Sequence, residues 1–360
     1  MSAAVIQQLH DSPWQGVFHV TGGGVTLLSQ LLGVSGASRT VLEATVPYAS
    51  AALDQLLGQK PEQAASAATA RALAMAAYQR ARTLTDATCF GLGCSASLVT
   101  DRSKRGQTRA HWAVQTATAS WDFYLELDAT RQRHEQEAEL CNRLVESLAS
   151  TLLDQPWSGP GMAVCRPDPA WHDLLNDAPY RWCTGDHPGD LILPGSFNPV
   201  HEGHYQMLQV AQDICGKVGA FELTLRNADK PDLDYLSVQE RLTLMQNHQV
   251  WLTNQANFAA KAELFPGATF VLGTDTLVRI GQPRFYGDSE QVRDQAIHRL
   301  RDLDIDFLVL GRLDGQQFIG LEDLTLPKPL RDLCRGVPES VYRNDASSTQ
   351  IRQGQSQPTQ

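Results

Sequence analysis

Apolar residues along this chain follow two patterns that alternate. Short runs of apolar and β-branched residues predict strands at 16–20, 40–46, 88–93, 190–193, 221–225, 268–272 and 306–310. Apolar residues at helical spacing predict helices at 25–32, 49–57, 61–82, 129–153 and 205–215. Two strands within 109–127 are expected to pair as a hairpin, and 94–97 is expected to be a loop of small residues. Alternating strands and helices are typical of an α/β protein.

The composition changes between residues 154 and 189. Prolines and glycines interrupt any long element there, and Trp157, Trp171, Tyr180 and Trp182 supply apolar anchors. Such a linker is expected to pack on one or both of its neighbours. We therefore predict a first α/β domain at 1–154, a packed linker at 155–189, a second domain with a parallel sheet at 190–353, and a flexible tail at 354–360.

Composition narrows the class of protein. The chain has 360 residues, of which 42% are hydrophobic and 19% charged, and its net charge of −10 argues against broad nucleic-acid binding. The absence of a run of about eighteen apolar residues argues against membrane insertion. The seven cysteines show no Cys-x-x-Cys pairs, so the sequence predicts reduced thiols in a cytoplasmic protein and no metal site.

The strongest chemical signal is the stretch Gly195-Ser196-Phe197-Asn198-Pro199-Val200-His201-Glu202-Gly203-His204. It follows the strand at 190–193 and precedes a helix, where unpaired N–H groups and the helix dipole favour an anion such as phosphate. His201 and His204 project from the first turn and can donate hydrogen bonds to phosphate oxygens. The plain alternative is a tight turn with two solvated histidines.

A second stretch, Asp345-Ala346-Ser347-Ser348-Thr349-Gln350-Ile351-Arg352, has the composition of another phosphate-binding helix start. The hydroxyls of Ser348 and Thr349, with neighbouring N–H groups, can hold phosphate oxygens. Arg352 can add a charge-assisted pair. The plain alternative is a capped helix without a ligand.

Together the two stretches resemble the signatures of the nucleotidylyltransferase superfamily, whose members join a nucleoside triphosphate to a phosphorylated acceptor and release pyrophosphate. Gly273-Thr274-Asp275 resembles the corresponding element of nicotinate and nicotinamide mononucleotide adenylyltransferases. The resemblance implies a Rossmann-like second domain in which His201, His204 and Arg352 act in catalysis. It also implies that Gly195, Ser196, Phe197, Ser348 and Thr349 contact the nucleotide.

Several other residues of the second domain are candidates with plain alternatives. Lys230, in the loop after the strand at 221–225, is a phosphate ligand or a solvated lysine. Asp275 lies near the nucleotide or caps the next helix. Ser237 and Glu240 are expected to form a capping box that starts a helix. With Arg241 they resemble the Ser-x-x-Glu-Arg pattern of these enzymes, and the resemblance implies that Arg241 supports the acceptor site.

The first domain resembles the C-terminal domain of the CinA family, known for hydrolysing the amide of nicotinamide mononucleotide. The likeness rests on Thr21-Gly22-Gly23, the stretch 33–38, Pro47-Tyr48 and Leu56-Leu57-Gly58. Three departures fall where the family carries catalytic side chains: its serine is His19, its lysine is Leu53 and its threonine is Gly93. We therefore expect an inactive amidase fold kept for ligand binding or assembly, although the glycines at 22–24 could let a phosphate approach.

The favoured function is transfer of AMP from ATP to nicotinate or nicotinamide mononucleotide, with Mg²⁺ held mainly by the triphosphate. CTP as donor, or another small phosphorylated acceptor such as phosphopantetheine, would use the same phosphate contacts. A nucleotide-binding regulator without turnover and a working amidase are the other classes left open. Both resemblances also imply a homo-oligomer.

Overall fold

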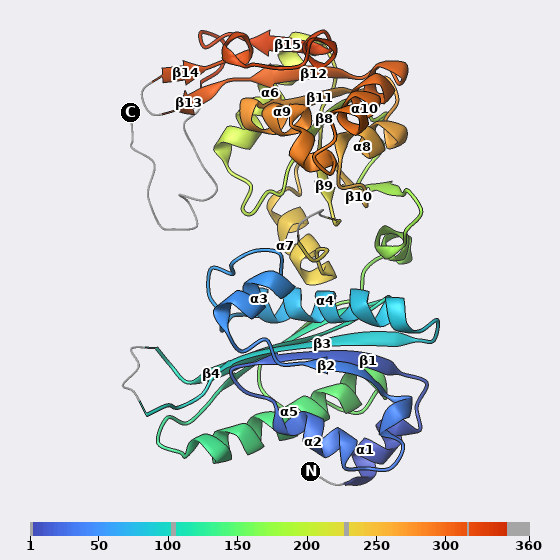
Figure 1. The fold of residues 1–360 in the computed structure, drawn as a ribbon, viewed down its shortest axis with the longest axis vertical. Coiled ribbons are helices and arrows are strands. Elements are labelled where there is room, and N and C mark those ends of the chain that lie inside the picture. The colour runs from blue at the N-terminus through green and yellow to red at the C-terminus, as the bar shows by residue number, and fades with distance from the viewer. Residues whose placement is uncertain (1–2, 102–105, 227–229, 315–316, 344–360) are drawn as a thin grey trace. The chain divides into compact units, whose positions relative to one another are not determined.

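The computed structural model describes residues 3–101, 106–226, 230–314 and 317–343 (Figure 1). Its contacts divide the chain into two compact units. The first unit consists of Met1–His172 and Asp229–Gln239, and the second consists of Asp173–Ala228 and Glu240–Gln360. The predicted tail at 354–360 and the stretch 345–352 lie outside the described residues.

The first unit is built on a six-stranded mixed sheet in the order β2-β1-β3-β4-β5-β6. β1 pairs in parallel with β2 and β3, whereas the pairs from β3 to β6 are antiparallel. Helices α3 and α4 cover one face, and α1, α2 and α5 cover the other (Figure 1). The elements are α1 (Ala3–His10), β1 (Gln15–Thr21), α2 (Thr26–Leu32), β2 (Val41–Thr45), α3 (Ser50–Leu56), α4 (Ala67–Leu84), β3 (Cys89–Ser97), β4 (Arg109–Thr116), β5 (Ser120–Glu126), α5 (Arg133–Leu152) and β6 (Met162–Cys165).

The predicted loop at 94–97 is wrong, because β3 continues through it to Ser97. β3 pairs with β4 as far as Ser97 and Arg109, so the backbone groups of the small residues are used in the sheet. Small residues are needed on β3 because α4 lies directly over it. A Cβ added to Gly91 or Gly93 would come within 2.2 or 2.3 Å of α4 backbone atoms. α4 itself begins at Ala67, later than the predicted 61, because Ser66 caps it by accepting the Thr69 N–H at 3.2 Å.

The second unit contains a seven-stranded sheet in the order β15-β12-β11-β8-β9-β10-β7. Every pair from β15 to β10 is parallel, and β7 joins the edge in the antiparallel sense. The α/β class and the parallel sheet of the second domain are thus confirmed. The elements are β7 (Arg181–Cys183), β8 (Leu191–Pro194), α6 (Glu202–Cys215), β9 (Ala220–Thr224), β10 (Val250–Thr253), α8 (Phe258–Leu264), β11 (Thr269–Gly273), α9 (Thr274–Gly281), α10 (Glu290–Asp302), β12 (Asp306–Leu310), β13 (Arg312–Asp314), β14 (Gln317–Ile319), α11 (Lys328–Arg331) and β15 (Cys334–Val337). Helix α7 (Tyr235–Leu244) begins in the segment Asp229–Gln239 of the first unit and ends in the second.

The strand order of this sheet reverses at β8. From β8 the chain moves outward to β9 and then β10, and it returns to the other side of β8 to form β11 and β12. Loops that leave the carboxyl ends of β8 and β11 therefore diverge, and open parallel sheets bind ligands in the crevice formed at such a point. A core of aromatic and aliphatic residues, including Phe270 and Phe307 of the sheet and Leu277 and Leu300 of α9 and α10, fixes the strands on one face.

No helix among the described residues is long and apolar enough to cross a bilayer.

Candidate functional site

The site predicted from the first phosphate stretch lies where β8 ends. The Gly195 N–H donates to the Glu222 carbonyl oxygen at 3.0 Å, which ties the turn to β9. The chain then passes through a cis Asn198–Pro199 bond and enters α6, with His201 in extended backbone as the N-cap residue. α6 begins at Glu202, earlier than the predicted 205, so both histidines stand at its first turn.

Packing of the Phe197 ring accounts for the residue types at positions 195 and 197 of the signature. Its side chain is only 2% exposed, and its ring makes edge contacts with the rings of Phe221 and His204, each at 5.1 Å between centroids. Its backbone has a positive φ of 42°, which costs free energy in a non-glycine residue. A Cβ on Gly195 would lie 2.6 Å from the Phe197 ring, so glycine is needed at 195 to admit that ring. Ser196 between them is exposed.

The two histidines of the signature lie against each other. Their ring centroids are 3.8 Å apart with an interplanar angle of 30°. The His201 backbone N–H donates to Nδ1 of His204 at 3.2 Å, so a neutral His204 carries its proton on Nε2. Nδ1 of His201 is buried and has no hydrogen-bond partner among the described residues. The pair therefore retains ring nitrogens that are not used within the described fold.

Burial sets the charge of this pair. It lowers the pKa of His201, and burial together with the neighbouring His201 lowers the pKa of His204 to about 4. Both rings are thus neutral at pH 7. A neutral imidazole N–H can donate to a phosphate oxygen without the electrostatic cost of placing two cations 4 Å apart.

Asp275 lies on the other side of the reversal in strand order. Gly273 is the N-cap residue of α9, so the plain reading of Asp275 as the cap is wrong, and Asp275 stands in the first turn of α9. Its exposed carboxylate pairs with Arg312, which begins β13 two positions after the end of β12. Exposed pairs of this kind contribute about 0–1 kcal/mol, so a bound ligand can displace one partner at little cost.

The remaining predicted residues have different outcomes. Lys230 is exposed and falls within Asp229–Gln239, the segment that belongs to the first unit. Ser348, Thr349 and Arg352 lie outside the described residues. Ser237 is not the helix cap: α7 begins at Tyr235, and the Asp234 carboxylate accepts hydrogen bonds from both the N–H and the hydroxyl of Ser237. Arg241 is half-buried on α7.

Sequence reasoning did not identify Arg312 or Tyr342 as members of the site. The Tyr342 hydroxyl donates to the Gly203 carbonyl oxygen at 3.3 Å, so the chain that leads to the second phosphate stretch is held on the first turn of α6. A tyrosine in a loop gives no sequence signal for such a contact. Arg312 lies two positions beyond the carboxyl end of β12, and this place is the signal that could have identified it.

In the first unit, a side chain of the protein itself binds the end of the glycine turn at 22–24. The N–H groups of Gly24 and Thr26, at the start of α2, donate to the Glu137 carboxylate of α5 at 2.8 and 2.9 Å. Gly24 is one of the three glycines that were expected to let a phosphate approach. The Glu137 carboxylate accepts its N–H in place of a ligand.

The three residues at which the sequence was expected to depart from the CinA pattern, His19, Leu53 and Gly93, are all buried. His19 is 2% exposed, its Nδ1 lies 2.6 Å from the Thr45 hydroxyl, and burial lowers its pKa. Leu53 is 5% exposed and packs with Leu57 and Leu73. Gly93 lies under α4, where no side chain fits.

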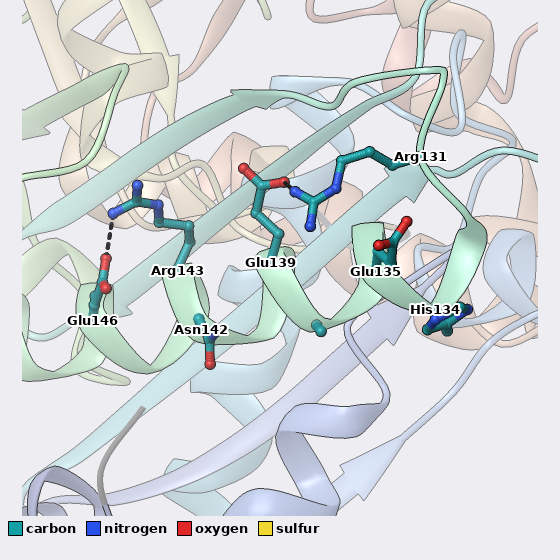
Figure 2. A pocket seen from close by; sticks show the side chains of 8 residues that line it. Arg131, His134, Glu135, Glu139, Asn142, Arg143 and Glu146 are labelled. Atoms are coloured by element: carbon teal, nitrogen blue, oxygen red, sulfur yellow. Dashed lines mark hydrogen bonds and ion pairs between the residues drawn. The ribbon is translucent and has the colours of Figure 1, made fainter.

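A shallow pocket of about 480 Å³ lies on the outer side of α5 (Figure 2). Its lining comes from α5 and from Arg131, two positions before the helix. Its charges pair with each other: Arg131 with Glu139 at 2.8 Å and Arg143 with Glu146 at 2.6 Å. No set of polar groups converges in it as a ligand would require. Within the described ranges, no group of three or more His, Cys, Asp or Glu side chains could hold a metal ion.

Comparison with protein families identifies the part of the chain that contains the histidine turn. Residues 192–354 match the family model described as cytidylyltransferase-like. The match begins within β8 and extends past β15, so it covers both predicted phosphate stretches. It confirms the predicted likeness to nucleotidylyltransferases and supports nucleotidyl transfer as the activity of the cytidylyltransferase-like domain.

The N-terminal region matches solved structures of the CinA superfamily. A competence/damage inducible protein from Agrobacterium tumefaciens has 17% identity and a TM-score of 0.36, over 42% of this chain and 95% of that one. A CinA superfamily protein from Enterobacter cloacae has 14% identity and a TM-score of 0.35, over 42% and 91%. A competence damage-inducible protein from Klebsiella pneumoniae has 13% identity and a TM-score of 0.36, over 43% and 96%. No curated protein matches the sequence.

Proposed function

We propose that the cytidylyltransferase-like domain transfers AMP from ATP to nicotinate or nicotinamide mononucleotide and releases pyrophosphate. The observation that carries this proposal is the neutral, mutually packed pair of His201 and His204 at the start of α6, beside the point where the strand order reverses. The likeness of Gly273-Thr274-Asp275 to adenylyltransferases of pyridine mononucleotides favours this acceptor class.

The proposed reaction needs no covalent intermediate. An oxygen of the acceptor phosphate attacks the α-phosphorus, a new P–O bond forms, and the bond from the α-phosphorus to the β-phosphate oxygen breaks, so pyrophosphate takes the electron pair. The Nε2–H of His204 and a ring N–H of His201 donate to phosphate oxygens on which charge develops. The positive end of the α6 dipole acts in the same direction.

Arg352, Ser348 and Thr349 are proposed to hold the leaving β- and γ-phosphates. The contact of Tyr342 with the first turn of α6 supports this, because it anchors the chain that leads to them near the histidines. Mg²⁺ would neutralise charge on the triphosphate. Its donors would be mainly phosphate oxygens, since the described residues form no carboxylate cluster that suits a hard cation.

A second candidate is cytidylyl transfer from CTP to another small phosphorylated acceptor, such as phosphopantetheine or a phosphorylated alcohol. The description of the matched family favours a cytidine nucleotide. The phosphate contacts proposed above are the same for both donors, so the base has to be distinguished by experiment.

The test is release of pyrophosphate by the purified full chain with Mg²⁺ and ATP or CTP, against each acceptor in turn. Release with ATP and a pyridine mononucleotide is the expected result. Release only with CTP or another acceptor would favour the second candidate, and no release from folded protein would favour a nucleotide-binding regulator. We also propose that the first unit lacks amidase activity, and ammonia release from nicotinamide mononucleotide in the same samples would overturn that.

A further inference from the structure

The sheet of the second unit opens where its strand order reverses. β8 and β11 pair at only two positions, the second of which joins Ile192 to Phe270. Beyond that pair, β8 continues to pair with β9 as far as Pro194, and β11 continues to pair with β12 as far as Gly273. The carboxyl ends of β8 and β11 therefore separate, in the position where open parallel sheets bind ligands.

Gly273, the last residue of β11, borders open space. Its φ of −81° and ψ of 161° are ordinary for any residue, so the backbone conformation does not require a glycine here. A Cβ added to Gly273 would meet no described atom within 4 Å. This edge of the sheet therefore has room for a bound group beside the first turn of α9.

Arg312 is fixed at the same edge, beyond the end of β12. It begins β13 and pairs with Ile319 of β14. The Phe318 ring covers Gly311, because a Cβ on Gly311 would lie 2.2 Å from it. The Arg312 guanidinium reaches the Asp275 carboxylate of α9, and the two side chains are 54% and 58% exposed. The backbone of Arg312 is thus held in place while its charged group stays open to solvent.

Arg312 supplies a positive charge that the loops at this edge otherwise lack. In the described stretches 195–204, 274–277 and 311–314, which follow β8, β11 and β12, it is the only lysine or arginine. The two histidines at the start of α6 are neutral at pH 7, because burial lowers the pKa of each. In these stretches, an anionic substrate can therefore find a full positive charge only at Arg312.

We propose that Arg312 is a substrate-binding residue, which exchanges the Asp275 carboxylate for an anionic group, a carboxylate or a phosphate, of the bound nucleotide or acceptor. The inference rests on the proposed function for the identity of these ligands. A guanidinium can take either anion with two parallel hydrogen bonds. The exchange costs little, because an exposed ion pair contributes little to stability.

Arg312→Gln and a matched control, Arg299→Gln, test the proposal. Arg299 forms an ion pair of similar exposure with Glu263, at 49% and 43%, but it joins α10 to α8. Isothermal titration calorimetry of the full chain measures binding of ATP or CTP with Mg²⁺, and of nicotinate and nicotinamide mononucleotide. Arg312→Gln is expected to weaken binding of at least one of these ligands by about tenfold or more, and Arg299→Gln none by more than about twofold.

The pattern of losses in Arg312→Gln identifies the anionic group. Loss for nicotinate mononucleotide alone assigns Arg312 to the carboxylate of the ring, equal loss for both mononucleotides assigns it to their phosphate, and loss for ATP or CTP alone assigns it to the triphosphate. Arg312→Lys keeps the charge without the planar fork, so it should recover part of the lost affinity. If no ligand loses more affinity in Arg312→Gln than in Arg299→Gln, the proposal is wrong.

The exchange predicts an effect of opposite sign for Asp275→Asn. Without its carboxylate partner, Arg312 should bind the same ligand about two- to fivefold more tightly, and this gain should be absent when Arg312→Gln is added. Unchanged or weaker binding in Asp275→Asn would overturn the exchange.

Kinetics of pyrophosphate release separate this inference from the proposed function. Ligand binding that depends on Arg312, in a protein that releases no pyrophosphate, would overturn the proposed function and leave Arg312 as a binding residue. Release that is equal in Arg312→Gln and Arg299→Gln, with equal ligand binding, would overturn the role of Arg312 alone. Folded protein that binds none of the ligands would overturn both.

Discussion

At the scale of single residues, the two ring nitrogens of His204 have separate tasks. Nδ1 accepts the N–H of His201 and so completes the start of α6, whereas Nε2 is left as a donor. An asparagine at this position can place its oxygen close to Nδ1, and a glutamine can place its amide nitrogen close to Nε2. The two substitutions therefore divide the structural role from the chemical one.

For His204→Asn we expect a folded protein whose kcat/KM for transfer is about 10²–10³-fold lower, the usual effect of losing one donor to a developing charge. For His204→Gln we expect more residual transfer but a loss of about 1 kcal/mol of stability, because the helix-start hydrogen bond is removed. Steady-state kinetics and urea unfolding measure the two effects. His248→Asn, at an exposed histidine stacked on Tyr205, is the matched control. Wild-type turnover in His204→Asn would exclude His204 from the reaction.

The sequence predicted this pair correctly as a feature of the helix start, because a signature of ten residues fixes both spacing and context. It did not predict why Gly195 and Phe197 are needed. The ring of Phe197 covers Gly195 and supports His204, and this is a contact between side chains that no local pattern records. Arg312 and Tyr342 were missed for the same reason: their partners lie 37 and 139 positions away along the chain.

At the scale of elements, a buried ion pair joins α8 to β9. Nζ of Lys261 lies 2.5 Å from the Glu222 carboxylate, and the Thr253 hydroxyl of β10 also donates to it. Glu222 has no exposed surface and Lys261 is 5% exposed. The carbonyl oxygen of Glu222 receives the Gly195 N–H, so this pair lies next to the phosphate turn along β9.

Lys261→Met is expected to lower the free energy of unfolding of the second unit by about 3–5 kcal/mol, because it leaves a buried carboxylate without its cation. Adding Glu222→Gln should recover most of that loss, since the amide is neutral and can still accept from Thr253. Urea unfolding of the two single variants and the double variant measures the coupling. A loss below about 1 kcal/mol in Lys261→Met would show that the pair is not needed for stability.

Elements were predicted correctly where their own residues have a clear apolar pattern. The predictions were wrong where contacts with another part of the chain determine the structure. The strands at 16–20, 221–225 and 306–310 are present because apolar runs require burial. Residues 94–97 have the composition of a loop, yet they continue β3 because each of them pairs with a residue of β4. The capping box predicted at Ser237 is absent, because α7 begins earlier, at Tyr235. The Asp234 carboxylate accepts the Ser237 N–H that the capping box had assigned to Glu240.

At the scale of the whole molecule, each unit contains a buried histidine that is neutral in the fold: His19 in the first and His204 in the second. Burial lowers the pKa of both side chains, to about 4 for His204. An unfolded chain binds a proton at each histidine below about pH 6.5, whereas the folded units do not until the pH is lower. Stability is therefore full above pH 6.5 and is lost as the pH falls toward 4.

We expect acidification from pH 7 to 5 to weaken both units, with His204 contributing at most about 3 kcal/mol over its full range. His204→Asn should reduce the acid sensitivity of the second unit alone, and His19→Asn, which keeps an acceptor for Thr45, should reduce that of the first alone. Hydrogen exchange resolved to β11–β12 and to β3–β4 separates the two responses. If either variant changed the pH dependence of both units equally, the two would unfold as one cooperative block, and the acid response would belong to the whole chain rather than to each histidine in its own core.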